Sequence, residues 1–316
     1  MRKASVSEDR IIEIIAMNRM GLFWQYPVIT EKAFYDQNKE DVNYLGLPWA
    51  TIIDRRYPIN TLLSSIIPYL DSSREYYTCC QHIYFRVLAP LWKRLNIKTV
   101  YTPHKTTGTN TLDGIKIVSC PLYAVNVEDP TRNKGLKLEK LALLGYQRRY
   151  LLSFVGGWQQ KDYLSDVRQR IFALGKAGKS DIFIRATGGW HFNDVVYNKL
   201  QNRDGDLNED SQHKKKTAVY NVILLNSRYT LAPSGSGPNS IRFWEALGVG
   251  SIPVLLSDTL ELPSHKLWDQ AIIRIKESRV QEIEGILRQI SPEEENKRRA
   301  NCLRLYDHFK DNYCNR

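Results

Sequence analysis

A short glycine-containing loop that opens directly onto a helix is the segment of this chain best suited to binding chemistry. The loop, residues 233–240, lies between an apolar strand pattern and a helical pattern. Gly235 and Gly237 let backbone N–H groups approach a ligand closely, and the unpaired amides and dipole of a helix N-terminus favour phosphate. We therefore predict that a diphosphate binds here. The predicted loop contacts are Ser234, Gly235, Ser236, Gly237, Asn239 and Ser240.

Two charged residues, Arg242 and Glu245, follow within the first turns of that helix. Their spacing places both side chains on one face, which we expect to be exposed, while apolar residues occupy another face. The planar fork of Arg242 can pair with phosphate oxygens, and Glu245 can accept hydrogen bonds from two ribose hydroxyls. A surface ion pair between them is the alternative, and it would contribute little energy.

Several sequence blocks with fixed spacings surround these two residues. The chain reads Leu224–Pro233, then Ser240-x-Arg242-x-x-Glu245-Ala246-Leu247, Ile252-Pro253-Val254, Asp258 and Leu262-Pro263. Together these blocks resemble the signature of exostosin-like glycosyltransferases, glycosyltransferase family 47. The resemblance covers the second half of the chain. Looser matches are Leu151–Gly157 with Val167-Arg168, Cys80-Gln81-His82, and Tyr101–Lys105.

The resemblance implies an enzyme that moves a sugar from a nucleoside diphosphate to a carbohydrate hydroxyl. A UDP-sugar is the family's usual donor, and the expected acceptor is an oligosaccharide or another glycan. The family's reaction inverts the anomeric carbon by direct displacement and needs neither a metal nor another cofactor. The resemblance also implies donor-binding roles for Arg242 and Glu245 and an acceptor-side role for His82.

Such a transfer requires a base for the acceptor proton and positive charge for the departing diphosphate. The helix N-terminus and Arg242 supply the charge. We predict His82 as the base because an imidazole titrates near neutral pH, with Asp54 and Asp71 as competitors. A structural histidine at a strand end is the alternative for His82. His104 and Lys105 are predicted to contact the acceptor or a phosphate.

Alternating strand and helix patterns predict an α/β fold with parallel sheets. We expect two Rossmann-like domains facing a cleft, the arrangement called GT-B in the resembled enzymes. Ligands bind beyond the carboxyl ends of such strands, so Gly156 and Arg185 join the predicted donor site. Arg185 can equally cap a helix. The predicted strands of the first half are residues 50–53, 76–80, 98–101 and 115–118, and its predicted helices are residues 61–70 and 83–95, the second kinked at Pro90.

The predicted domains follow from where this alternation is interrupted. Residues 1–145 form the acceptor-side domain, and a basic, polar stretch ends it. Residues 146–290 form the donor nucleotide-sugar-binding domain. By the resemblance, residues 291–316 form a C-terminal helix that returns to the first domain.

A dinucleotide-dependent oxidoreductase is the principal alternative function. Gly235-x-Gly237-x-x-Ser240 nearly matches the G-x-G-x-x-G fingerprint for NAD(P), and Asp258 follows the next strand. Ser240 in place of the third glycine weakens that match. Asp204-Gly205-Asp206 has the form of a metal-holding D-x-D motif, but its polar surroundings favour a solvated loop.

Composition is compatible with a two-domain enzyme. The 316 residues are 42% apolar and carry a formal net charge of +11, which favours anionic ligands. Nucleic-acid binding is a weaker alternative, because an aromatic content of 11% in an α/β protein more often serves the core and sugar contacts. The five scattered cysteines indicate reduced thiols.

The sequence contains no apolar run of the roughly 20 residues that an integral membrane segment requires, and no signal-peptide core. As written, the chain is therefore expected to be cytoplasmic, in a microbial or viral setting. The Golgi lumen, where eukaryotic members of the resembled family are anchored, is the expectation if a leading anchor has been removed.

Overall fold

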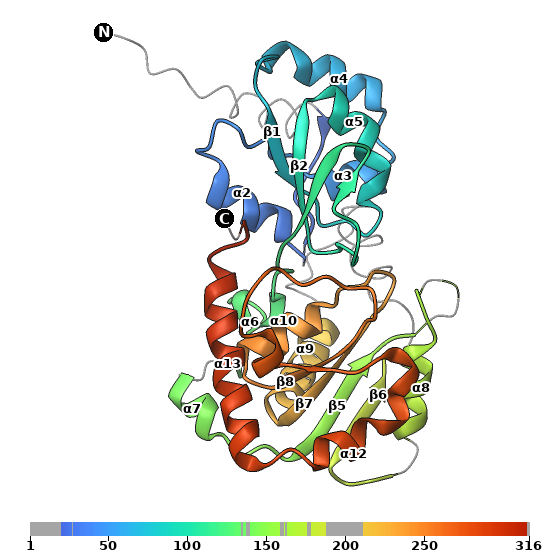
Figure 1. Cartoon of the computed structure of the whole chain (residues 1–316), viewed down its shortest axis with the longest axis vertical. Helices are drawn as coiled ribbons and strands as arrows, with labels where there is room; N and C mark the ends of the chain where they lie inside the picture. Colours follow the sequence, from blue (N-terminus) through green and yellow to red (C-terminus); the bar gives the residue numbers. More distant parts are fainter. Residues whose placement is uncertain are drawn as a thin grey trace. The chain divides into compact units, whose positions relative to one another are not determined.

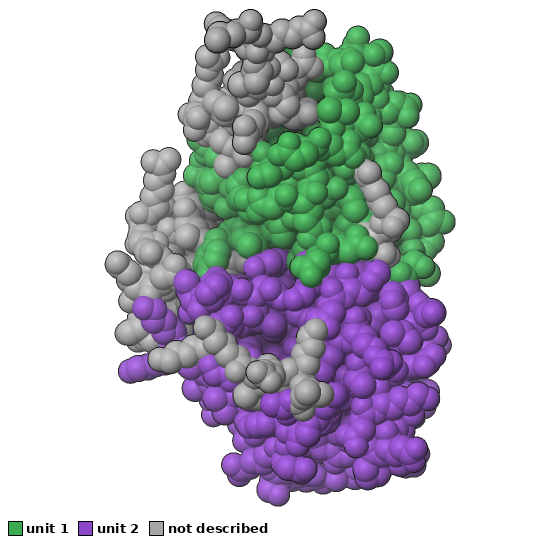
Figure 2. All heavy atoms as spheres, turned by 90° about the vertical axis from the view of Figure 1, so that its left-hand side faces the viewer, with its two compact units in different colours: residues 1–121, 261–264, 311–316 green, residues 122–260, 265–310 purple. Residues whose placement is uncertain are grey.

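The computed structural model describes residues 20–26, 28–133, 135–136, 140–158, 161, 163–175, 178–187 and 211–314. The chain divides into two compact units, coloured green and purple in Figure 2. Unit 1 comprises Met1–Pro121, Glu261–Ser264 and Asp311–Arg316, and unit 2 comprises Leu122–Leu260 and His265–Lys310. The chain thus crosses between the units more than once.

Unit 1 is built on a four-stranded sheet in the order β1-β2-β4-β3 (Figure 1). Three of its strands are parallel, and β3 pairs antiparallel with β4. The strands are β1 (Tyr76–Cys79), β2 (Ile97–Thr102), β3 (Thr111–Leu112) and β4 (Ile115–Ser119). The helices are α2 (Thr30–Asn38), α3 (Trp49–Asp54), α4 (Ile59–Ile66), η2 (Ile67–Tyr69), η3 (Phe85–Leu88) and α5 (Ala89–Arg94). Trp49 and Trp92 meet edge to face at 5.9 Å within the core of this unit.

The strand predicted at residues 50–53 is wrong, because this segment belongs to α3. Trp49 to Ile52 are all buried, so the segment lacks the polar alternation that separates strand from helix. The Glu31 carboxylate accepts the N–H of Ala50 at 3.1 Å and so satisfies an amide of the first helical turn. A partner distant in sequence therefore favours the helix. The helix predicted over residues 83–95 forms two pieces, η3 and α5, with Pro90 in the first turn of α5.

Unit 2 is built on a five-stranded parallel sheet in the order β6-β5-β7-β8-β9. The strands are β5 (Tyr150–Gly156), β6 (Ile182–Ala186), β7 (Ser227–Pro233), β8 (Ile252–Leu256) and β9 (Ile273–Arg274). The helices are α6 (Val125–Glu128), α7 (Lys140–Gly145), α8 (Val167–Gly175), α9 (Ser211–Leu225), α10 (Ile241–Gly248), α11 (Trp268–Ala271), η5 (Glu277–Glu282), α12 (Ile283–Arg288) and α13 (Pro292–Lys310). The predicted α/β class with parallel sheets is confirmed.

The long final helix, α13, packs within unit 2. Phe309 stacks on Trp268 with ring centroids 5.4 Å apart and meets Trp244 edge to face at 5.7 Å. The C-terminal segment belongs to unit 1 only after Lys310. There the N–H of Tyr313 donates to the Gln37 side chain at 3.1 Å. Unit 2 begins at Leu122, and α6, which follows Leu122, packs on α10. The predicted boundary at residue 145 therefore falls inside unit 2. Within the described ranges, no helix is long and apolar enough to cross a membrane.

Candidate functional site

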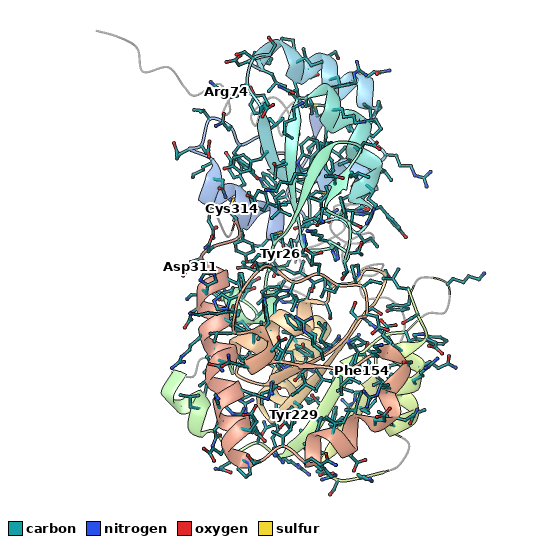
Figure 3. The ribbon with its side chains drawn as sticks, in the orientation of Figure 1. Tyr26, Arg74, Phe154, Tyr229, Asp311 and Cys314 are labelled. Atoms are coloured by element: carbon teal, nitrogen blue, oxygen red, sulfur yellow. The ribbon has the colours of Figure 1, made fainter. Side chains whose placement is uncertain are left out.

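The carboxyl ends of β5, β7 and β8 lie side by side in the unit 2 sheet. Beyond them come Gly156 and Gly157, the glycine loop that begins at Ser234, and Ser257 with Asp258. In open parallel sheets this edge is where ligands bind. Phe154, labelled in Figure 3, lies near the end of β5 and marks this region.

Two arginines lie over the Phe154 ring. The guanidinium carbon of Arg168, from α8, is 5.8 Å from the ring centroid, and that of Arg242, from α10, is 4.7 Å from it. Arg168 donates to the carbonyl oxygens of Ser234 and Gly157, each at 2.9 Å. Arg242 donates to the carbonyl oxygen of Val155 and, at 3.4 Å, to the Ser240 hydroxyl. Every one of these acceptors is an uncharged oxygen.

Among the described residues, the positive charge of this arginine pair therefore has no directly paired counterion. Neither guanidinium forms an ion pair with a carboxylate in the part of the chain that the structure describes, and the buried Nε of Arg242 has no hydrogen-bond partner there. Burial, followed by the charge of Arg242, lowers the pKa of Arg168 to about 10. Arg168 still carries its proton at neutral pH. Two half-buried guanidiniums that donate only to uncharged oxygens among the described residues are an arrangement suited to a phosphate or diphosphate.

The glycines at these strand ends make room for the arginines. A Cβ at Gly156 would lie 2.9 Å from a terminal nitrogen of Arg242, and a Cβ at Gly235 would lie 2.7 Å from one of Arg168. The sequence-based expectation was that glycine freed amides for the ligand. Instead, the Gly235 N–H donates to the carbonyl of Gly237 at 2.9 Å, and the Ser240 N–H donates to the Asn239 side chain at 2.8 Å.

The predicted serines of the loop have different surroundings. The Ser234 hydroxyl donates to Glu277 at 2.8 Å, so this serine links the loop to η5. The hydroxyl of Ser236, and that of Ser257 after β8, are buried with no hydrogen-bond partner among the described residues. A polar ligand at this end of the sheet could supply the hydrogen-bond partners that these two buried hydroxyls lack among the described residues.

Glu245 lies inside unit 2, with 3% of its surface exposed. The Tyr220 hydroxyl donates to one of its oxygens at 2.7 Å, and the N–H of Asn126, from α6, donates to the other at 3.1 Å. Burial raises the pKa of this carboxyl. The predicted exposed face shared by Arg242 and Glu245 is therefore wrong, because α6 and α9 cover the helix on the Glu245 side. Ribose binding by Glu245 stays a prediction.

Arg185 is placed at a different point of the same sheet. It lies near the end of β6, is exposed, and has its guanidinium carbon 5.2 Å from the Phe183 ring. Its predicted donor role stays a prediction.

In unit 1 the structure brings two predicted residues into direct contact. Asp54 ends α3, His82 follows β1, and His82 Nε2 lies 2.9 Å from Asp54 Oδ1. The two side chains are 6% and 10% exposed, respectively. The Gln25 amide donates to the second Asp54 oxygen, and the Tyr84 N–H donates to His82 Nδ1 at 3.0 Å. Because Nδ1 accepts, the proton of a neutral His82 ring lies on Nε2 and points to Asp54.

Glu31 positions both members of this Asp54–His82 pair. Its buried carboxyl group accepts the N–H of Ala50 in α3 and, at 3.0 Å, the N–H of Gln81 beside His82. Burial raises the pKa of Glu31 to about 8. One side chain thus links the helix that carries Asp54 to the loop that carries His82.

The other predicted unit 1 residues have different surroundings. Asp71 lies before the amino end of β1, where hydrogen bonds from Ser73 lower its pKa, so it is at the opposite end of that strand from His82. His104 is buried, and burial followed by the His82 charge lowers its pKa to about 3, which keeps its ring neutral. Lys105 pairs with Glu261 at 2.6 Å, so its charge is already compensated.

Arg168, Phe154 and Glu277 carry no predicted role, although each belongs to this site. The signal for Arg168 was present, since Val167-Arg168 follows Leu151–Gly157 in the resemblance. Asp204-Gly205-Asp206 lies outside the described residues. Across the described parts of the chain, no group of three His, Cys, Asp or Glu residues could hold a metal ion, and the five cysteines are buried and form no disulfide.

Comparisons with known proteins identify the family. A model of the exostosin GT47 domain matches residues 119–290, which is more than half of the chain and includes the arginine pair. Drosophila melanogaster exostosin-1 is 30% identical over 148 residues, covering 46% of this chain and 18% of that protein. The Caenorhabditis elegans exostosin-1 homolog is 29% identical over 197 residues, covering 61% and 48%. Mus musculus exostosin-1 is 28% identical over 176 residues, covering 55% and 22%.

The chain therefore belongs to the exostosin GT47 family, and the predicted family is confirmed. It spans less than half the length of these curated relatives. Nothing in the comparisons supports the oxidoreductase alternative. Among solved structures, the N-terminal domain of Candida albicans trehalose-6-phosphate phosphatase aligns with 99% of this chain at 9% identity and a TM-score of 0.41, which is too weak to indicate a shared fold.

Proposed function

We propose that this protein is a glycosyltransferase that transfers a sugar from a UDP-sugar to a hydroxyl of a glycan. The observation that carries the proposal is the Arg168 and Arg242 pair, two half-buried cations at the ligand-binding edge of a parallel sheet that have no carboxylate partner among the described residues. Family membership supports the transferase class and a nucleotide-sugar donor. The proposal places the donor diphosphate on the two guanidiniums of unit 2.

The proposed reaction is a direct displacement in a GT-B-type enzyme. The acceptor oxygen forms a bond to the anomeric carbon while the bond from that carbon to the diphosphate oxygen breaks, and its electron pair leaves with UDP. Attack from the face opposite the leaving group inverts the anomeric centre. Arg168 and Arg242 stabilise the negative charge that develops on the leaving diphosphate. Because they supply that charge, the proposed mechanism is metal-independent.

We assign removal of the acceptor proton to the Asp54–His82 pair of unit 1. Both ring nitrogens of His82 are engaged, one with Asp54 and one with the Tyr84 N–H. The carboxylate is therefore the group that receives the proton, and His82 is a positioning residue that donates to it. Assignment of the base to His82 alone would require the Tyr84 contact to open.

Binding tests the donor part of this proposal. Isothermal titration with UDP, with NAD as the comparison ligand, should show binding of UDP only, and EDTA should leave it unchanged. A UDP concentration of about 100 times Kd should add ~2.7 kcal/mol to the free energy of unfolding and raise Tm. Binding of NAD but not of UDP would contradict the proposal.

Kinetics test the base. Asp54→Asn should lower kcat by roughly 10²-fold or more while leaving the Kd of UDP unchanged, because the acid–base contribution is lost and the arginines are untouched. His82→Asn keeps an N–H donor toward Asp54 and should lower kcat less. The rising limb of the pH–rate profile should shift in the His82 variant, which a purely structural role would not produce. Equal losses in both variants with an unshifted profile would reject this assignment.

A further inference from the structure

Ser234 connects the arginine pair of unit 2 to a carboxylate. Its carbonyl oxygen accepts from Arg168 Nε at 2.9 Å, and its hydroxyl donates to Glu277 Oε1 at 2.8 Å. Glu277 begins η5, which packs against α8, the helix that carries Arg168. The end of β7 thus has a cation on one side and a carboxylate on the other, joined through a neutral serine.

A second carboxylate supports the first. Asp258 follows β8 and accepts the backbone N–H of Glu277 at 3.0 Å. In the described part of the chain neither Glu277 nor Asp258 forms an ion pair, although Ser234 contacts both Glu277 and Arg168. Ser257, which precedes Asp258, is 7% exposed and has a buried hydroxyl with no described hydrogen-bond partner. A buried hydroxyl without a partner is costly unless a ligand supplies one.

This arrangement of charges would orient a bound nucleotide sugar, with its diphosphate toward the arginines and its sugar toward the carboxylates. Carboxylates repel a diphosphate but accept hydrogen bonds from hydroxyls, and guanidiniums favour the diphosphate. We propose that Glu277, supported by Asp258, binds hydroxyls of the transferred sugar and selects a neutral sugar over a uronic acid. The inference rests on the proposed function, since it needs a nucleotide diphosphate on Arg168 and Arg242. It adds the chemical class of the donor sugar and the residues that distinguish it.

The test measures the sugar's own contribution to binding. Isothermal titration should give Kd values for UDP, UDP-glucose, UDP-galactose, UDP-xylose, UDP-N-acetylglucosamine and UDP-glucuronate with the wild-type chain and with Glu277→Gln. In the wild type, at least one neutral UDP-sugar should bind about tenfold more tightly than UDP-glucuronate, because a hydrogen bond to a charged group is replaced by repulsion. Glu277→Gln should remove most of that ratio and leave UDP itself bound equally or more tightly.

Glu282→Gln is the matched control, because Glu282 is an exposed acid of the same η5 segment that pairs with Arg279. It should leave all six Kd values unchanged. Asp258→Asn should reduce the ratio less than Glu277→Gln does. The melting temperature and circular dichroism of each variant verify folding.

The outcomes separate the two proposals. UDP binding with a wild-type preference for UDP-glucuronate, or with a ratio that Glu277→Gln does not change, overturns the sugar subsite and leaves the proposed function standing. Failure to bind UDP or any UDP-sugar overturns both.

Discussion

Arginines lie at both ends of the unit 2 sheet, but their partners differ. At the amino end, Arg228 in β7 and Arg299 in α13 share the carboxylate of Glu295, with contacts of 2.8 Å from Arg228 Nε and 2.5 Å from Arg299. Arg148 beside them donates to the backbone carbonyls of Leu225 and Val249, and burial, followed by the charge of Arg299, lowers its pKa to about 9. At the carboxyl end, Arg168 and Arg242 donate only to uncharged oxygens among the described residues.

The carboxylate of Glu295 is the difference. It compensates Arg228 and Arg299 at the amino end, while the described residues give Arg168 and Arg242 no such counterion at the carboxyl end. The hydrogen bond to Glu295 raises the pKa of Arg228, whereas burial and Arg242 lower that of Arg168. A buried ion pair is stable only while both partners are present, and a buried cation without a counterion is a cost that a bound anion can remove. The amino end therefore stabilises the fold, and the carboxyl end is expected to gain stability when a diphosphate binds.

The largest expected effect is at the amino end. Glu295→Gln removes the counterion of two arginines and should lower the free energy of unfolding by ~3–5 kcal/mol. Urea denaturation at neutral pH measures the change. The control is Glu282→Gln, which breaks an exposed pair and should leave the denaturation midpoint almost unchanged. A similar midpoint for both variants would contradict the distinction between the two ends.

Removing an arginine from the carboxyl end should give the opposite pattern. Arg168→Met and Arg242→Met should each weaken UDP binding by about ten- to a hundredfold, since a charge-assisted hydrogen bond contributes ~1.5–3 kcal/mol. Each should leave the stability of the ligand-free protein unchanged or higher, because an uncompensated buried charge is lost. Titration calorimetry and urea denaturation of the same samples check both parts. Marked destabilisation with UDP affinity retained would show that the pair is structural.

Glycine substitutions sharpen the comparison further. Gly235→Ala forces the Arg168 guanidinium to move, because the new Cβ would lie 2.7 Å from it, and we expect UDP affinity to fall by roughly tenfold or less. Gly285→Ala in α12 is the control, since a Cβ there meets nothing within 4 Å. It should raise stability by ~0.5–1 kcal/mol through helix propensity and leave UDP affinity unchanged. Equal UDP affinity in both variants would be inconsistent with the proposed role of Gly235.

The smallest effect concerns Glu245, whose partners are neutral donors rather than arginines. Burial raises its pKa, so the folded state binds more protons than the unfolded state above the ordinary pKa of a glutamate. The contribution of Glu245 to stability is therefore complete below that ordinary value and is lost as pH rises through the raised value. Glu245→Gln should flatten this decline when unfolding is measured at several pH values from 5 to 8. An unchanged slope would show that the carboxyl is ionised in the folded protein.

Periodicity in the sequence predicted β1, β2 and β4 of unit 1, because their apolar residues lie between turn signals, and it missed the two-residue strand β3. It misassigned α3 because a short apolar run fits either element, and the Glu31 contact that favours the helix comes from a distant part of the chain. The charged pair on α10 was misjudged for a related reason. Spacing shows that Arg242 and Glu245 share a face, but it does not show that α6 and α9 cover part of that face.

The sequence by itself determined the family, the parallel α/β class and the glycine loop, because local spacing and apolar patterns encode all three. Tertiary structure alone decided that Arg168 joins Arg242 over Phe154, that Asp54 meets His82, and that Glu245 is buried. These contacts join residues from separate elements, and burial, charge compensation and available hydrogen-bond partners depend on what those elements bring together. The chemistry of the site follows from those three properties.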